Sequence, residues 1–70
     1  MDFVFTFHAL TRMHERSIGM NHVLNAVQTP HKLWRENERF FAQKQFTQRR
    51  LEVVYEKSEN IIKIITVYWL

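Results

Sequence analysis

The residues best suited to acid–base and phosphate chemistry lie in one stretch, HALTRMHER, at positions 8 to 16. An α-helix turns about 100° per residue, so His8, Arg12 and Arg16 would share roughly a third of its circumference with Glu15. A guanidinium matches the geometry of a phosphate, and an imidazole titrates near neutral pH and transfers protons. The spacing predicts that this side of the helix binds phosphate and transfers protons, provided that the side is accessible beside the sheet. The alternative is a solvated side on which Arg12 pairs with Glu15.

Further polar candidates lie in segments that favour strands. Lys44 alternates with apolar residues in RFFAQKQF, so it either extends to solvent at a rim or is held for a function. Tyr68 lies on a strongly apolar segment, where a tyrosine packs in the core or, if exposed, stacks on a base or donates a hydrogen bond to phosphate. Three arginines would either extend a basic patch or form the charged rim of a hairpin: Arg39, Arg49 and Arg50.

Several classes of chemistry lack their residues in this chain. There is no cysteine, which excludes disulfides and zinc held by thiolates. The four histidines show no spacing typical of metal ligands, and there is no glycine-rich phosphate loop or nucleophile elbow. We therefore expect no metal and no cofactor, and any chemistry would rely on His, Lys, Arg, Tyr and Glu.

Size and composition predict one small globular domain over residues 1–70. The chain is 46% hydrophobic, and ten Lys and Arg against seven Asp and Glu give a formal charge of +3. That balance is compatible with binding to nucleic acid or to an acidic protein. The apolar segments are too short to span a membrane, and the first residues, MDFVFTFHAL, do not have the pattern of a signal peptide. A cytoplasmic location is the expectation.

Two helices are predicted in the first thirty residues, after a short strand in FVFTF. The first runs from His8 to about Arg16 and would pack through its apolar and small side, Ala9, Leu10, Met13 and Ser17. The second begins after Gly19 as N-cap, with Ile18 and Val23 at the spacing of a hydrophobic staple. It would end before Pro30 and pack through the stripe Met20, Val23, Leu24 and Val27.

The rest of the chain favours strands, in HKLWRE, RFFAQKQF, RRLEVVYE and IIKIITVYW. The turns between them lack glycine and would use Asn37, Ser58 and Asn60. We predict an α+β domain with the order β-α-α-β-β-β. In it, two packed helices lie against one face of a mostly antiparallel, four-stranded twisted sheet.

The segments FTFHALTRMHERSI, RFFAQKQF and RRLEVVYEKSENIIKIITVYW resemble a bacterial family of small domains of unassigned function. In that family His-x-x-x-Arg-Met-x-x-Arg begins the first helix, as His8, Arg12, Met13 and Arg16 do here. The resemblance covers nearly the whole chain. The family is grouped with the RelE/ParE-like toxin superfamily, and its genes often lie beside one for a zinc-finger antitoxin.

The resemblance implies a RelE-like fold and the toxin component of a type II toxin–antitoxin pair. The expected activity is metal-independent cleavage of mRNA, free or on the ribosome, through attack of the 2′-hydroxyl on its own phosphate. His8 would be the acid or base, Arg12 and Arg16 would hold the phosphate, and Lys44 with Arg49 or Arg50 would assist as cations. Arg39, Arg49, Arg50 and Tyr68 would contact RNA.

The resemblance leaves two alternatives, since the superfamily includes toxins that act on gyrase and the fold does not determine the target. One is a non-catalytic interaction module or an inhibitor of a protein target. The other is a structural domain whose helix side meets another subunit. The expected partners are thus RNA and a cognate antitoxin, and the exposed edges leave room for a homo-oligomer.

Overall fold

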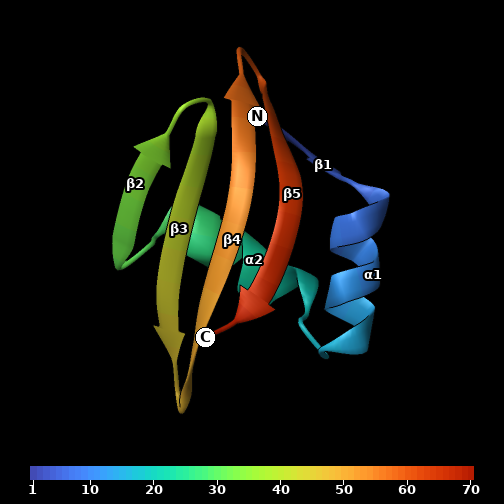
Figure 1. Ribbon diagram of the computed structural model, residues 1–70, viewed down its shortest axis with the longest axis vertical. Helices are drawn as coiled ribbons and strands as arrows, with labels where there is room; N and C mark the ends of the chain where they lie inside the picture. Colours follow the sequence, from blue (N-terminus) through green and yellow to red (C-terminus); the bar gives the residue numbers. More distant parts are fainter.

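A computed structural model describes residues 1–70 and contains two helices and five strands (Figure 1). The α+β class and the presence of two helices agree with the sequence prediction. No helix has the length and apolar character needed to cross a bilayer. The elements are β1 (Asp2–Phe5), α1 (Phe7–Glu15), α2 (Met20–Gln28), β2 (Lys32–Glu36), β3 (Arg39–Phe46), β4 (Arg49–Ser58) and β5 (Ile61–Trp69). The predicted packing of the helices on each other is replaced by packing of α1 on β5 and of α2 on β3 and β4.

The sheet has five strands in the spatial order β1-β5-β4-β3-β2, so the prediction of a four-stranded sheet is wrong. Strands β2 to β5 form an antiparallel meander, and HKLWRE supplies a strand of its own, β2, at one end. At the other end β1 pairs in parallel with the first half of β5, which makes the sheet mixed. The β1–β5 pair joins opposite ends of the chain, and local sequence pattern carries no signal for such a partner.

Turns of two residues join the strands of the meander. Asn37 adopts a left-handed conformation with φ 57°, which asparagine tolerates better than most residues. Asn60 lies in the turn between β4 and β5, whereas Ser58 is the last residue of β4. The prediction is thus right for the two asparagines and wrong for Ser58.

Helix α2 crosses one face of the sheet, behind β3 and β4 in Figure 1. It begins after Gly19 and ends before Pro30, as predicted. The Nδ1 atom of His22 accepts a hydrogen bond of 3.1 Å from the Gly19 N–H and so satisfies one free donor at the helix start. Its buried residues are Val23, Ala26 and Val27, whereas Met20, predicted to be in the stripe, is exposed.

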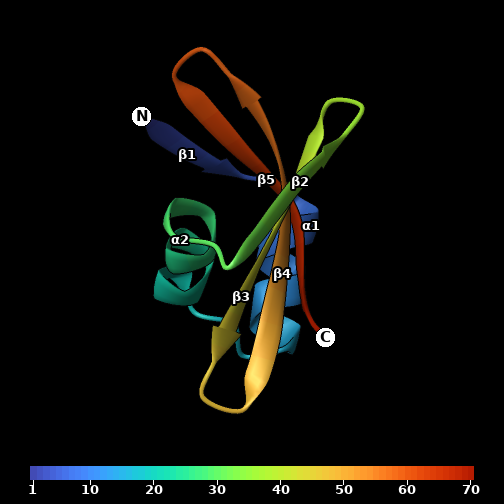
Figure 2. The ribbon, with the colours of Figure 1, turned by 90° about the vertical axis from the view of Figure 1, so that its left-hand side faces the viewer.

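Helix α1 lies alongside β5 rather than over the centre of the sheet (Figure 1). Ala9 and Met13 are buried, as the predicted packing side requires, but Leu10 is 47% exposed. A helix at the edge of a sheet has a narrower contact than one lying on its face, so only part of the apolar arc is covered. Figure 2 shows α2 on one side of the strongly twisted sheet and α1 behind the strands, and the buried residues of both helices belong to the same hydrophobic core. The prediction that the helices lie against one face holds for α2, whereas α1 lies at the β5 edge.

One hydrophobic core joins both helices to the sheet. Leu51, Val53 and Tyr55 of β4 face it, as their alternation predicts, and residues of β3 and β5 flank them. Leu51 is completely buried, so Leu51→Ala should lower the free energy of unfolding by about 2–5 kcal/mol. Leu10→Ala removes the same atoms from a largely exposed site and should cost much less. Urea unfolding followed by circular dichroism measures both, and equal losses would contradict this core.

Tyr55 gives the core a dependence on alkaline pH. Burial raises the pKa of its phenol above the ordinary value of 10.0, because the anion loses solvation. The unfolded chain therefore ionises first, so this stabilisation is complete below pH 10 and is lost as the pH rises through the folded-state pKa. Tyr55→Phe should show a weaker decline in unfolding free energy between pH 9 and pH 11 than the unaltered protein. Identical declines would exclude this contribution.

Candidate functional site

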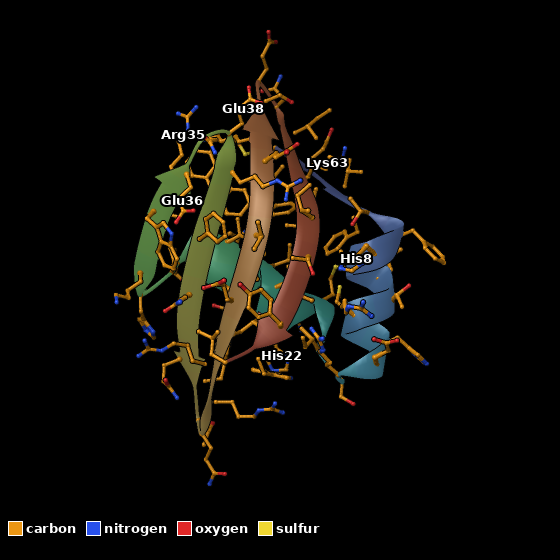
Figure 3. The ribbon with its side chains drawn as sticks, viewed as in Figure 1. His8, His22, Arg35, Glu36, Glu38 and Lys63 are labelled. Atoms are coloured by element: carbon orange, nitrogen blue, oxygen red, sulfur yellow. The ribbon has the colours of Figure 1, made fainter.

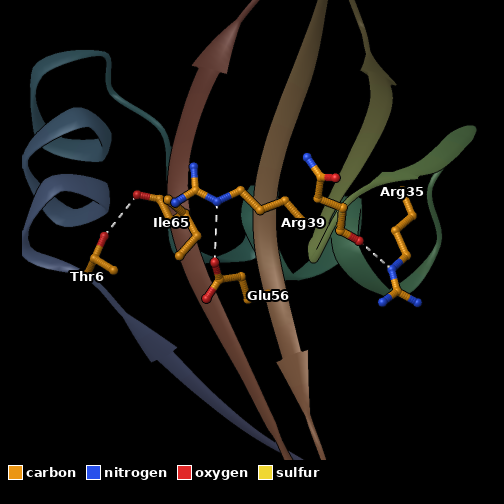
Figure 4. A network of polar contacts seen from close by, with 6 residues as sticks. Thr6, Arg35, Arg39, Glu56 and Ile65 are labelled. Carbon is orange, nitrogen blue, oxygen red and sulfur yellow. Dashed lines mark hydrogen bonds and ion pairs between the residues drawn. The ribbon is translucent and has the colours of Figure 1, made fainter.

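Thr6 fixes the beginning of α1 to strand β5. Its N–H donates to the Ile64 carbonyl at 3.1 Å, and its hydroxyl donates to the Ile65 carbonyl at 2.9 Å (Figure 4). The same hydroxyl oxygen accepts the Ala9 N–H at 3.0 Å, which makes Thr6 the N-cap of the helix. The start of α1 is thereby placed against β5 just beyond the end of β1.

The other end of α1 is attached to β5 by a second pair of bonds. The Arg16 guanidinium donates to the Val67 carbonyl at 3.1 Å, and the Trp69 indole N–H donates to the Arg16 carbonyl at 3.0 Å. Ser17 follows with φ 53°, and the Ile18 N–H bonds back to the Met13 carbonyl, the pattern of a Schellman cap. These contacts hold α1 along β5 and fix the Arg16 side chain against the strand.

An open groove of about 850 Å³ lies between α1 and the end of β5. It brings together five of the eight residues predicted from the sequence: His8, Arg12, Arg16, Arg49 and Tyr68. Figure 3 shows His8 on the side of α1 that lies next to β5, and its side chain is exposed. We call this the α1–β5 groove; its lining is His8, Arg12, Glu15, Arg16 and Ser17 with Arg49, Thr66, Tyr68 and Trp69.

The α1–β5 groove carries three guanidinium groups against one carboxylate. Arg12 pairs with Glu15 at 2.6 Å, the contact that the solvated-side alternative predicts. That pair is partly exposed, and such pairs contribute only about 0–1 kcal/mol, so a phosphate can compete for Arg12. Arg16 bonds to a backbone carbonyl, and Arg49 lies 4.5 Å from the centre of the Trp69 ring. Neither has a carboxylate partner, which leaves both charges for an anion.

Trp69 also lines the groove, in contact with Arg16 and Arg49, and was not predicted as a site residue. Its ring also meets the edges of His22 and Phe46, with centroids 5.7 and 6.4 Å away. The sequence predicted only that aromatic residues of this strand pack in the core. Its position beside α1 results from the indole bond to Arg16, and no local sequence signal reports a contact between residues so far apart.

Lys44 lies outside the α1–β5 groove and has a structural role. Its ammonium donates to the Thr29 carbonyl at 3.0 Å, to the Thr29 hydroxyl at 2.6 Å and to Asn25 Oδ1 at 3.4 Å. These acceptors surround the C-terminal end of α2, where a cation is favourable. Of the two roles considered for this lysine, the structure favours a specific one: its ammonium caps the C-terminal end of α2.

Arg39 and Arg50 also lie outside the groove. Arg39 pairs with Glu56 at 3.3 Å on neighbouring strands (Figure 4). Arg50 contacts the side-chain oxygens of Gln43 and Gln45 at 3.5 and 3.4 Å. Both arginines are on the sheet face opposite α2, because they alternate with the core residues of their strands. Arg49 takes the other face of β4 by the same alternation, so the three arginines do not form the single patch or rim that was predicted.

Glu52 is a buried carboxylate on that same face of the sheet. It is 5% exposed and accepts a hydrogen bond of 2.7 Å from the Gln43 amide. Its register partner on β5 is Tyr68, which lines the α1–β5 groove. Val54, on the same face of β4, is buried as well.

A second hollow, of about 860 Å³, lies near the turns at the other end of the sheet. It is lined by as many acidic as basic side chains, and it contains no histidine. The α1–β5 groove has the excess of positive charge and the imidazole. It is therefore the better site for an anionic ligand. The basic and acidic residues of the second hollow are Arg35, Lys57 and Lys63 with Glu38, Glu56 and Glu59.

Fold and site together define a small α+β domain with a cationic, imidazole-bearing groove at the edge of its sheet. Residues 5–69 match a family described as a domain of unknown function, DUF4258, and the chain belongs to that family. No curated protein and no solved structure matches the chain. No group of three or more His, Asp or Glu side chains is arranged to hold a metal ion.

The attachment of α1 can be tested through Thr6. Thr6→Val keeps the shape but removes the N-cap bond and the bond to Ile65, so unfolding free energy should fall by about 2 kcal/mol. Thr11→Val makes the same exchange on α1 at a hydroxyl without these two bonds, and should change stability by less than about 0.5 kcal/mol. Denaturant titrations compare the two. Equal stability of Thr6→Val and the unaltered protein would show that these bonds do not hold the helix.

Proposed function

We propose that this protein is the toxin component of a type II toxin–antitoxin pair, with a RelE/ParE-like fold, that cleaves RNA in the cytoplasm. One observation carries the proposal: an open imidazole and three guanidiniums share one groove. Two of those guanidiniums have no carboxylate partner. RNA supplies a phosphate for the cations and a 2′-hydroxyl that a base can activate. The cognate antitoxin would carry a zinc-finger domain, as the sequence resemblance implies.

The proposed reaction needs no metal ion. Neutral His8 takes the proton of a 2′-hydroxyl, whose oxygen attacks the adjacent phosphorus. The bond from phosphorus to the 5′-oxygen breaks, water supplies the proton that this oxygen needs, and the products are a 2′,3′-cyclic phosphate and a 5′-hydroxyl. Arg12, Arg16 and Arg49 stabilise the charge that develops on the phosphorane oxygens. General base help of this kind contributes about 10²–10⁴ in rate.

The proposal keeps only one of the auxiliary cations expected from the sequence, which were Lys44 with Arg49 or Arg50. Lys44 is engaged by the end of α2 and Arg39 by Glu56, whereas Arg49 lies in the α1–β5 groove. Arg49 is therefore the auxiliary cation that we propose, with Tyr68 as a further contact to RNA. Arg50 would meet only the part of an RNA that extends over the sheet.

His8→Ala should reduce cleavage about 10²–10⁴-fold, because the base is lost while the cations remain. His14→Ala is the matched control, since His14 is exposed on the same helix but outside the groove. Cleavage of a labelled RNA is followed by the appearance of 2′,3′-cyclic phosphate ends, and a substrate with a 2′-deoxyribose at the cut should not react. Full cleavage by His8→Ala would remove this residue from the mechanism.

RNA binding without cleavage is the alternative function, and the Arg12–Glu15 pair favours it, because Glu15 occupies a guanidinium that cleavage would need to stabilise the phosphorane. In either case binding should weaken with salt, with a slope of about −2 in log affinity against log salt concentration for three phosphate contacts. Arg16→Ala should weaken binding and reduce this slope by about 0.7. Fluorescence anisotropy measures both, with Arg35→Ala as the control outside the groove. An unchanged slope in Arg16→Ala would contradict this phosphate contact.

A further inference from the structure

Strand β2 ends the sheet, and its outer edge is uncovered. Its one strand neighbour is β3, and Figure 2, which looks onto this side of the molecule, shows no element in front of it. Half of the backbone N–H and C=O groups of such a strand point away from the sheet and can pair with another strand. The edge is therefore a site for strand addition, and its side chains decide what can add.

The charges of β2 are placed symmetrically about its central residue. Lys32 lies two residues before Trp34, and Glu36 lies two residues after it. Neither charge has an ion-pair partner within the chain. Four residues of strand span about 13 Å, so the two cannot reach each other.

We propose that two copies of this chain join through their β2 edges, antiparallel and centred on Trp34. In this register Lys32 of each copy lies opposite Glu36 of the other, which forms two cross-strand ion pairs. Trp34 lies opposite Trp34, and Leu33 lies opposite Arg35. A two-fold rotation maps this register onto itself, so the interface is closed and uses the same surface of both copies. The result would be one continuous ten-stranded sheet.

Both faces of the strand fit this arrangement. On one face Trp34 already stacks on Phe41, with ring centroids 5.4 Å apart, and the second Trp34 would extend that aromatic row. On the other face Leu33 is 52% exposed, and the aliphatic part of Arg35 from the second copy would cover it. Charged edges usually prevent pairing, because like charges meet. Here the sequence KLWRE instead brings opposite charges together.

The proposed contact is independent of the function proposed above. The α1–β5 groove lies at the other edge of the sheet, so both grooves of the dimer stay open. Loss of the dimer would therefore leave cleavage by each copy intact. Failure of cleavage would leave the association unchanged.

Charge reversal tests the register directly by sedimentation velocity over a range of protein concentrations. Lys32→Glu alone and Glu36→Lys alone each place like charges opposite one another twice, and each should weaken the dimer about tenfold. An equimolar mixture of these two variants should recover the affinity, because each heterodimer again opposes unlike charges. The double variant, Lys32→Glu with Glu36→Lys, should recover it as well.

The controls are Lys57→Glu and Glu59→Lys, which make the same changes of charge at exposed sites near the β4–β5 turn. They should leave the dimer unchanged, and circular dichroism verifies that all variants are folded. The proposal is overturned if the unaltered protein stays monomeric at millimolar concentration. The charges of β2 would then prevent the edge from pairing with another strand. The proposal is also overturned if a dimer forms but neither reversal weakens it, or if the mixture of single variants stays monomeric.

Discussion

The attachment of α1 to the second half of β5 is the contact on which the rest of the architecture depends. Strand β1 covers only the first half of β5, and beyond it the strand would expose unpaired carbonyl groups. Thr6 and Arg16, at opposite ends of α1, donate to two of those carbonyls. A helix thus occupies the place of a strand, and the space between its cationic side and β5 becomes the groove.

The same contact explains why structural and functional roles meet in single residues. Arg16 holds α1 through one guanidinium nitrogen and still presents positive charge to the α1–β5 groove. Trp69 donates to the Arg16 carbonyl and supports Arg49 from below. The site is therefore built on the ends of regular elements rather than on a loop, and such positioning limits the movement of its charges.

The local sequence pattern predicted the helices and strands. Their arrangement depends on contacts between segments that are far apart in the sequence. Gly19 and Pro30 predicted the ends of the second helix, and the alternation of residues in β4 predicted its core face. Both signals act over only a few residues. The partner of β1, the edge position of α1 and the use of Lys44 at the end of α2 depend on contacts between remote segments. His8, Arg12 and Arg16 could be predicted as one side because helical spacing is local, whereas Trp69 could not.

The two tryptophans allow the most direct test of the central claim that the α1–β5 groove binds RNA. Trp69 lies in that groove, and Trp34 lies on β2, three strands away in the sheet. Their indole N–H signals can be followed by ¹H–¹⁵N NMR while a short single-stranded RNA is added. The account predicts that the Trp69 signal shifts with saturation and that the Trp34 signal stays in place. A shift of Trp34 alone, or of neither signal at saturating RNA, would contradict it.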